Sequence, residues 1–196
     1  MRKLTTLAVL LFAVALQGCS LVNRPPEARQ GEVALQAVVA DGAKPIPENV
    51  EFTLIKVDGS GHRKVAALAK GGVVRVAVDP GDYALQTTFA QTTKEEKIVV
   101  EPAGTSHTVV LNAGEITLGV VTGSNRSKVQ RQIHWTIRQF GTKASSKPYY
   151  ETVAAQPYVV LPAGWYKVQA AFDGAVLNHV VEVEVGHHYN YFIAMR

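Results

Sequence analysis

The chain has 196 residues, 47% of them hydrophobic, and a formal net charge of +4. A charge this small on a chain of this length gives no electrostatic basis for binding nucleic acid. The chain has one cysteine, Cys19, so no disulfide can form within it. Its stability therefore has to come from hydrophobic cores.

Residues 1–18 have the pattern of a secretory signal peptide. Arg2 and Lys3 give a positive start, Leu4–Leu16 is apolar except for two threonines, and Cys19 follows directly. A charged stretch followed by a short apolar run is typical of such signals. The run is shorter than the roughly 20 apolar residues that a membrane-spanning helix needs. We therefore expect residues 1–18 to be a cleaved signal helix.

The segment Leu16-Gln17-Gly18-Cys19 resembles the lipobox of bacterial lipoproteins. The resemblance implies that Cys19 becomes the first residue of the mature protein and carries a diacylglyceryl thioether and a further acyl chain. Two or three chains anchor a protein stably, because each buried methylene contributes about 0.8 kcal/mol. The residue after the cysteine is Ser20 and not Asp. By resemblance to the enterobacterial sorting rule, in which Asp at this position directs retention, Ser20 favours sorting to the outer membrane.

Residues 19–30 are expected to form a short acylated tether. They include Pro25 and Pro26, and the ten residues from Leu21 to Gln30 span at most about 35 Å. The sequence thus predicts a lipoprotein of a Gram-negative bacterium, anchored in the outer membrane on its periplasmic face, whose folded part lies close to the membrane.

The rest of the chain contains an internal repeat with an offset of 83 residues. Gly31–Leu35 is echoed by Gly114–Leu118, Val50–Leu54 by Ile133–Ile137, and Gly81–Gln86 by Gly164–Gln169. After Val100 the offset falls to 82, which indicates a one-residue deletion in the second copy. We expect two tandem domains, 31–112 and 113–196.

Each repeat has the period-two alternation of β-strands. It is clearest at 33–39, 83–89, 166–172 and 181–185, and Gly-, Pro- and Asp-containing turns separate these runs. Asp173-Gly174 suits a two-residue hairpin, because Gly tolerates positive φ. About seven short strands in each repeat predict an all-β fold of two seven-stranded β-sandwiches.

Two pairs of aromatic residues occupy equivalent positions in the repeats. Phe52 and Trp135 lie on the same strand of each copy and are expected to fill the two cores. Tyr83 and Tyr166 follow the Pro-containing turns. We expect their rings to be buried and their hydroxyls to bond to nearby backbone at a corner of each sandwich.

Val160–Ala170, followed by Val181–Gly186, resembles the Leu-Pro-x-Gly-x-Tyr pattern of prealbumin-like domains. These include the carboxypeptidase regulatory-like and immunoglobulin-like modules of exported bacterial proteins. The resemblance covers the later part of each repeat and is weaker in the first, where Asp79 replaces the leucine. It implies a β-sandwich fold and a role as spacer, adhesive unit or docking platform, but no chemistry.

The sequence contains no recognisable catalytic or metal-binding motif. Ser60 lies in a turn and not in a Gly-x-Ser-x-Gly elbow, and His62 is not paired with an Asp at a spacing that predicts a catalytic triad. His187 and His188 should point to opposite faces of a strand, so with His179 they do not form a clear ligand set. We expect no cofactor, no metal and no enzymatic activity.

Aromatic residues are more frequent in the second repeat, where Tyr149, Tyr150, Tyr189 and Tyr191 are candidates for a partner surface. If they line one sheet face, they form a platform for a sugar or a partner strand. The alternative is that they pack between sheets or between the domains. Trp135 and Trp165 also make the second repeat the first place to look for a partner surface.

The expected function is a non-enzymatic one. The chain is predicted to be an envelope interaction or accessory module, held at the membrane through acylated Cys19, that keeps another envelope protein nearby. The alternative is a module that binds a glycan or small ligand through the aromatic face of the second domain. An enzyme is the third and weakest hypothesis.

Overall fold

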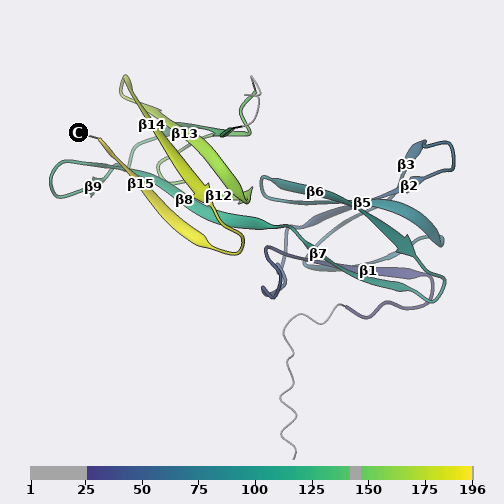
Figure 1. Cartoon of the computed structure of the whole chain (residues 1–196). Coiled ribbons are helices and arrows are strands. Elements are labelled where there is room, and N and C mark those ends of the chain that lie inside the picture. The colour runs from purple at the N-terminus through teal and green to yellow at the C-terminus, as the bar shows by residue number, and fades with distance from the viewer. Residues whose placement is uncertain (1–25, 142–146, 196) are drawn as a thin grey trace, which may run out of the picture.

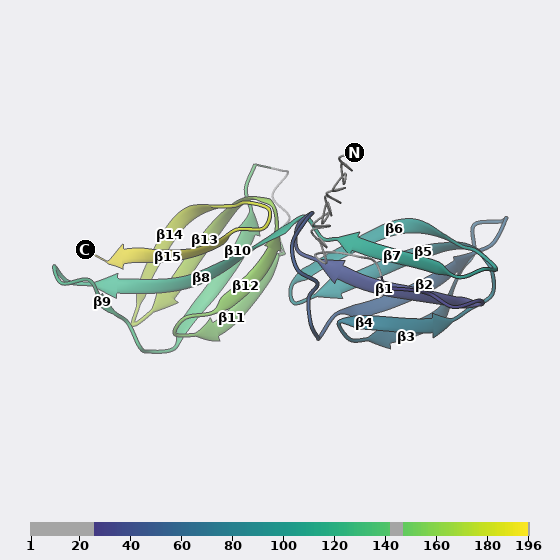
Figure 2. The ribbon, with the colours of Figure 1, turned by 90° about the horizontal axis from the view of Figure 1, so that it is seen from below.

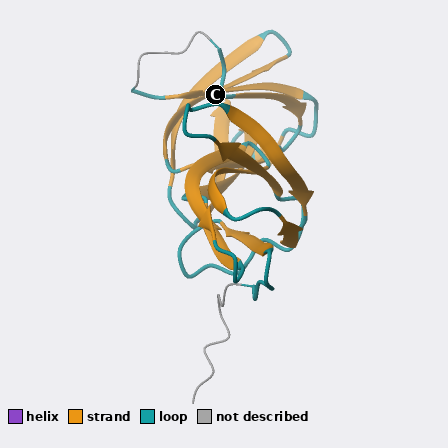
Figure 3. Cartoon of the chain, turned by 90° about the vertical axis from the view of Figure 1, so that its right-hand side faces the viewer, coloured by secondary structure: helices purple, strands orange, loops and turns teal. Residues whose placement is uncertain are grey.

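The computed structural model describes residues 26–141 and 147–195, and every regular element among them is a β-strand. The strands form four sheets, which pack as two sandwiches placed end to end (Figure 1). A view along the long axis shows only strands and connecting loops in the described part (Figure 3). The prediction of an all-β chain with two tandem sandwiches is confirmed, whereas the signal helix, Cys19 and most of the tether lie outside the described residues.

The first sandwich consists of β1–β7. One of its sheets has the strand order β4-β1-β7 and the other β3-β2-β5-β6. The parallel pairing of β1 with β7 brings the first and last strands of the sandwich side by side. The strands are β1 Glu32–Val38, β2 Glu51–Val57, β3 Arg63–Lys70, β4 Val73–Ala77, β5 Gly81–Phe89, β6 Thr92–Val100 and β7 Thr105–Val110.

The second sandwich consists of β8–β15 and has the same strand order. Its sheets are β12-β8-β15, with the two-residue β9 beside β8, and β11-β10-β13-β14. Without β9 it has the predicted seven strands. They are β8 Ala113–Thr122, β9 Ser127–Lys128, β10 Ile133–Gln139, β11 Tyr150–Ala154, β12 Tyr158–Pro162, β13 Gly164–Phe172, β14 Ala175–Val183 and β15 His188–Met195.

The offset of 83 residues persists to the last strands, so the predicted deletion is wrong. β6 and β14 have equal lengths, and four residues separate each of them from the next strand. The shorter offset came from the glycine, which lies at the fourth position of the first turn, Gly104, and at the third position of the second, Gly186. Both glycines have positive φ, 101° and 73°. The position that needs positive φ, which glycine adopts readily, is therefore one residue earlier in the second turn, although both turns have the same length.

The two expected core aromatics are buried as predicted. Phe52 on β2 is 1% exposed and Trp135 on β10 is 0% exposed. The Trp135 indole Nε1 donates to the carbonyl oxygen of Ala154 at 2.9 Å, so its polar atom is satisfied inside the second core. Burying such large side chains supplies much of the hydrophobic stabilisation of each small core.

A buried tyrosine ties down a corner of each sandwich, as predicted. The Tyr83 hydroxyl donates to the Asp79 carbonyl oxygen at 2.7 Å, and the Tyr166 hydroxyl donates to the Pro162 carbonyl oxygen at 2.8 Å. The side chains are 2% and 1% exposed. Between each tyrosine and its acceptor the chain turns through a glycine, and Gly164 has a φ of 149° that other residues rarely adopt.

The predicted hairpin at Asp173-Gly174 is also present. Phe172 pairs with Ala175 across it. Asp173 and Gly174 both have positive φ, 47° and 77°, as a type I′ turn requires. This turn fixes the register of β13 with β14, and hence the arrangement of side chains on the face that they share.

A short connection of two residues joins the sandwiches, and Figure 2 shows the chain passing from β7 into β8 there. Leu111 and Asn112 lie between β7 and β8, and Asn112 has the positive φ of 52° that asparagine tolerates. Backbone bonds flank the connection: the Ala113 amide donates to the Val39 carbonyl oxygen at 2.9 Å, and the Ala163 amide donates to that of Asn112 at 2.9 Å.

The turn between β5 and β6 caps the edge strand β12 of the second sandwich. The Val160 amide donates to Oε1 of Gln91 at 3.1 Å, and the Thr92 hydroxyl donates to the Val160 carbonyl oxygen at 3.1 Å. The Val160 side chain is fully buried and packs in the hydrophobic core of the first sandwich. The junction is therefore both hydrogen-bonded and apolar.

Replacing Tyr166 by Phe should destabilise the chain without altering its fold. The change removes the bond to Pro162 and leaves its carbonyl oxygen without that donor, at a cost of about 1–3 kcal/mol in the free energy of unfolding. Urea unfolding followed by circular dichroism measures this. Tyr150→Phe is the matched control, because no hydrogen bond of its hydroxyl is seen among the described residues. Equal stability of the two variants would contradict the corner role.

Candidate functional site

Tyr149 and Tyr150 lie at the start of β11, beside the junction. The Tyr149 hydroxyl donates to the Gln91 carbonyl oxygen of the first sandwich at 3.0 Å, and its ring meets that of Tyr166 edge-on with centroids 5.9 Å apart. Burial raises the pKa of Tyr149. Tyr150 packs against the second core. Both side chains thus take part in packing within the molecule.

Tyr189 and Tyr191 lie on β15, in the other sheet. Both rings pack against the second core, and their hydroxyls donate to Oε2 of Glu184 and to the carbonyl oxygen of Glu182, at 2.8 and 2.7 Å. β15 borders β14, which is at the opposite edge of its sheet from β11. The four tyrosines therefore do not come together on one face, and their role as a partner surface stays a prediction.

The turn between β2 and β3 brings together a serine, a histidine and an aspartate, which the sequence analysis did not foresee. Ser60 Oγ lies 2.6 Å from Asp58 Oδ1 and 2.7 Å from His62 Nδ1. The Ser60 hydroxyl and two backbone amides hold the pKa of Asp58 below its usual value. In a catalytic triad the serine bonds one imidazole nitrogen and the acid the other. Here Nδ1 faces both Ser60 and Asp58, which is the geometry of a polar turn.

A hollow of about 620 Å³ lies beside this turn, between the β2–β3 hairpin and the outer face of β5 and β6. Arg63 of β3 pairs with Glu95 of β6 at 2.8 Å across it. The hydrogen bond from Arg63 lowers the pKa of Glu95. This pair neutralises one charge of each sign, while Asp58, Asp82 and Lys97 also line the hollow beside the apolar side chains of Val57, Ala84 and Val99.

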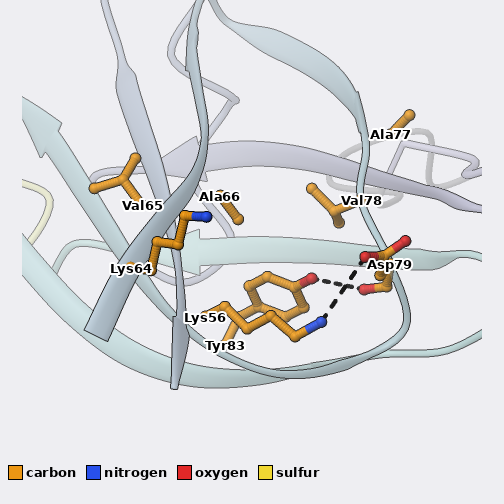
Figure 4. Close-up of a pocket in the computed structure, with 8 residues that line it drawn as sticks. All are labelled: Lys56, Lys64, Val65, Ala66, Ala77, Val78, Asp79 and Tyr83. Carbon is orange, nitrogen blue, oxygen red and sulfur yellow. Dashed lines mark hydrogen bonds and ion pairs between the residues drawn. The ribbon is translucent and has the colours of Figure 1, made fainter. Parts of the chain in front are cut away.

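A second hollow, of about 370 Å³, lies at the tyrosine corner of the first sandwich (Figure 4). The Tyr83 hydroxyl and the Lys56 ammonium group both point toward Asp79, and Lys64 reaches the opening from β3. Lys56 Nζ is 3.9 Å from Asp79 Oδ2 and 5.9 Å from the centroid of the Tyr83 ring. Most of its polar groups already serve the corner, so we assign this hollow a structural role.

A half-buried ion cluster joins the edges of the two sheets of the first sandwich. On β6, Lys94 Nζ lies 2.8 Å from Glu96 Oε2 and donates to the Val110 carbonyl oxygen at 2.7 Å. His107 Nε2 on β7 lies 2.5 Å from Glu96 Oε1. Burial by itself would raise the pKa of Glu96, but the hydrogen bonds from Lys94 and His107 outweigh it and lower the pKa.

The outer face of β12, β8 and β15 carries a second polar cluster. His188 Nε2 lies 3.1 Å from Thr117 Oγ1, and His188 Nδ1 lies 3.6 Å from Glu115 Oε2. The Tyr158 ring meets the His188 ring edge-on at 5.8 Å. Burial, helped by Glu115, raises the pKa of Tyr158 to about 12. His187 turns away and stacks on Tyr189.

The residues that sequence reasoning missed lie on the outer face of the sheet β11-β10-β13-β14. The register places Arg138 of β10 beside Lys167 of β13, and Gln169 of β13 beside Asn178 of β14. Together these four side chains line a hollow of about 280 Å³. Trp165, two residues before Lys167 on the same face, is 50% exposed.

Apolar side chains surround this hollow on the same face. Phe140 is 54% exposed, and its amide donates to the Trp165 carbonyl oxygen at 2.8 Å. Val153, Val176 and Val180 are also exposed. We call these nine residues the outer face of the second sandwich; they are Arg138, Phe140, Val153, Trp165, Lys167, Gln169, Val176, Asn178 and Val180. Alternation along β13 signals the outward position of Trp165, but no sequence pattern signals its neighbours on β10 and β14.

Residues 26–141 and 147–195 contain no group of three His, Cys, Asp or Glu side chains that could hold a metal ion. Over the same ranges, no helix is long and apolar enough to cross a membrane. Cys19, the expected acylation site, lies outside the described residues.

No protein-family model and no curated protein sequence matches the chain. Among solved structures it resembles the TIE protein of Bacillus anthracis, with 18% identity and a TM-score of 0.34, over 85% of this chain and 34% of that one. It also resembles a minor pilin of Streptococcus agalactiae, with 12% identity and a TM-score of 0.38, over 83% and 94% of the two chains.

The shaft pilin SpaA of Lactobacillus rhamnosus GG gives 12% identity and a TM-score of 0.38, over 87% of this chain and 98% of that one. The chain thus spans about a third of the length of the anthrax protein and nearly all of either pilin. With TM-scores below 0.5, these likenesses carry no argument about this chain, whose fold is described by its own strand order and cores.

Replacing Glu96 by Gln should make the free energy of unfolding less dependent on pH under acidic conditions. A carboxylate whose pKa is lowered on folding stabilises the native state above its unfolded pKa, and this contribution is lost as pH falls through the folded pKa. The free energy of unfolding should fall for the native chain between about pH 5 and pH 3, and less steeply for the variant. Urea unfolding at a series of pH values measures this.

The control for that series is Glu101→Gln, an exposed residue for which no ion pair is seen among the described residues. It should retain the slope of the unaltered chain. A Glu96→Gln slope equal to that of the control would show that the cluster does not stabilise the fold.

Proposed function

We propose that this chain is a lipoprotein of the outer membrane, exposed to the periplasm, that acts as a non-enzymatic interaction module for another envelope protein. The segment from Leu16 to Cys19 supports the anchor, because acylation of that cysteine would hold the chain in a bilayer. The tether 19–30 would keep the first sandwich close to the membrane.

The proposal rests on the junction between the sandwiches, which is both hydrogen-bonded and apolar. Tandem domains move relative to each other unless the interface between them is extensive. Here Gln91 and Thr92 satisfy both backbone groups of Val160, and the Val160 side chain fills the first core. A tandem stiffened in this way would present the second sandwich at a set distance from the anchored end, as an adaptor needs.

The outer face of the second sandwich supports a binding role. It contains five of the large hydrophobic side chains that the described part of the chain leaves exposed. Exposed apolar residues gathered on one sheet face commonly mark an interaction site. The turn at Ser60 does not have the geometry of a catalytic triad. Ser60 and Asp58 both face Nδ1 of His62, whereas in a triad the serine and the acid bond different imidazole nitrogens.

Cys19→Ser tests the anchor. The variant should move from the membrane fraction to the soluble periplasmic fraction and should no longer incorporate labelled palmitate, since serine cannot form the thioether. Membrane fractionation with palmitate labelling measures both. The proposal fails if the variant still partitions with membranes and still takes up palmitate.

Gln91→Ala combined with Thr92→Val tests the junction. The double change leaves the amide and the carbonyl of Val160 unpaired, which costs about 1–3 kcal/mol for each buried group. The connection Leu111–Asn112 should become sensitive to limited proteolysis, and the single unfolding transition should separate into two. Thr93→Val is the control, because the Thr93 hydroxyl bonds only the exposed Thr88 hydroxyl among the described contacts. Unchanged proteolysis of the double variant would count against a stiff tandem.

A further inference from the structure

We infer that the outer face of the second sandwich binds a saccharide that carries a carboxylate or phosphate group. The inference goes beyond the proposed function, on which it rests only to place the chain among envelope glycans, and it assigns this face to a saccharide and not to the partner protein. It rests on four properties of the face: its two cations, its amide pair, its exposed aromatic rings and the position of its polar hollow.

The two cations point to an anionic ligand. Arg138 and Lys167 are direct neighbours in the β10–β13 register, although like charges repel there. Among the described residues neither forms an ion pair. The acids on the same face lie outside the hollow: Glu151 accepts a hydrogen bond from Thr136, and Glu182 lies beside Trp165. Guanidinium groups match carboxylate and phosphate oxygens in a two-pronged geometry, and an ammonium group adds a point charge.

The amide pair suits hydroxyl groups. Gln169 Nε2 donates to Asn178 Oδ1 at 3.2 Å, which orients both amides on the sheet surface. Gln169 Oε1 and the Asn178 amino group then remain as an adjacent acceptor and donor. A sugar hydroxyl both donates and accepts, so it can bond the two together. The hollow of about 280 Å³ is slightly smaller than typical ligand sites, which span about 300–1,000 Å³, so it suits one ring of a longer chain.

The exposed aromatic rings suit the apolar face of a sugar ring. Trp165 and Phe140 are about half exposed at the end of the hollow next to Lys167 and Arg138. No hydrogen bond of the Trp165 indole nitrogen is seen among the described contacts. A pyranose has CH groups on its faces and hydroxyls at its edge, so it can contact a ring and bond the amides at once. The site combines apolar surface with a few convergent polar groups, which is typical of small-ligand sites.

The arrangement favours a saccharide over a protein. Protein interfaces have an apolar centre, from which charged residues are depleted, and a polar rim. Here the charged and amide groups, with Val180 beside Lys167, occupy the centre, between Val153 and Val176 toward one end of the sheet and Phe140 and Trp165 toward the other. A protein docked on this face would bury Arg138 and Lys167 at its centre, where unpaired charges are costly.

The test is a titration of the full-length chain, purified in detergent, with three probes. A peptidoglycan fragment carries carboxylates, a phosphorylated core oligosaccharide carries phosphates, and a neutral oligosaccharide of equal length carries neither. The chain has two tryptophans, and Trp135 is fully buried. A saturable change in tryptophan fluorescence therefore reports on Trp165. We expect it with at least one acidic probe, and the probe that binds identifies the anion.

Calorimetry on variants then locates the site. Trp165→Ala and Arg138→Gln should each weaken binding by about tenfold or more, the usual effect of removing a central aromatic or arginine contact. Arg138→Lys, which keeps the charge but loses the fork, should fall between Arg138→Gln and the unaltered chain. Tyr158→Ala is the control, because Tyr158 is 49% exposed on the opposite sheet and should leave affinity unchanged.

Several outcomes would overturn the inference. These are no saturable binding of either acidic probe, equal binding of the neutral one, or affinities that Trp165→Ala and Arg138→Gln leave unchanged. Urea unfolding of each variant shows that lost binding is not lost folding. The measurement on purified chain is independent of the anchor, so its failure is distinct from a failure of Cys19→Ser to release the chain from membranes.

Discussion

The strict alternation of side chains along β13 is the constraint on which both the core and the candidate site depend. Tyr166, Val168 and Ala170 point inward and are almost fully buried. Because successive residues of a strand face opposite sides, Trp165, Lys167 and Gln169 have to point outward. A one-residue slip of this strand would exchange the two sets and destroy the core. The outward position of Trp165 is thus enforced by the burial of Tyr166.

The corner bond and the glycine turn make this register stable. Gly164 admits a backbone conformation closed to other residues, which brings the chain from β12 into β13, and the Tyr166 hydroxyl ties the crossing back to Pro162. At the other end, Asp173-Gly174 sets how β14 pairs with β13. The positions of Lys167, Gln169 and Asn178 relative to one another follow from these two turns. The backbone positions of the site are therefore set by the sandwich that carries it.

The junction makes the two copies of one sequence unequal. Edge strands expose unpaired backbone groups, and proteins usually cover them. The first sandwich caps β12 through the side chains of Gln91 and Thr92, and in return it takes up the Val160 side chain as part of its core. At the equivalent position on β4, the edge strand of the first sandwich, Ala77 is exposed. Coupling between neighbouring repeats, rather than the repeats alone, determines how the outer face is placed relative to the amino-terminal end.

The sequence alone determined features that depend on local chemistry: the alternating strands, the hairpin at Asp173-Gly174, the tyrosine corners and the repeat of 83 residues. The sequence wrongly indicated a deletion, because a glycine moved by one position within a turn of unchanged length. It did not predict the contact of Ser60 with His62, which depends on how the β2–β3 turn closes. The order of the strands in each sheet was also not predicted from the sequence, since pairing between distant segments is a property of the folded chain. Only the tertiary structure separated Tyr149 from Tyr189 and brought Arg138, Lys167 and Asn178 together from three strands. The physical reason is that periodicity specifies which way a side chain points, whereas its neighbours across a sheet depend on long-range packing.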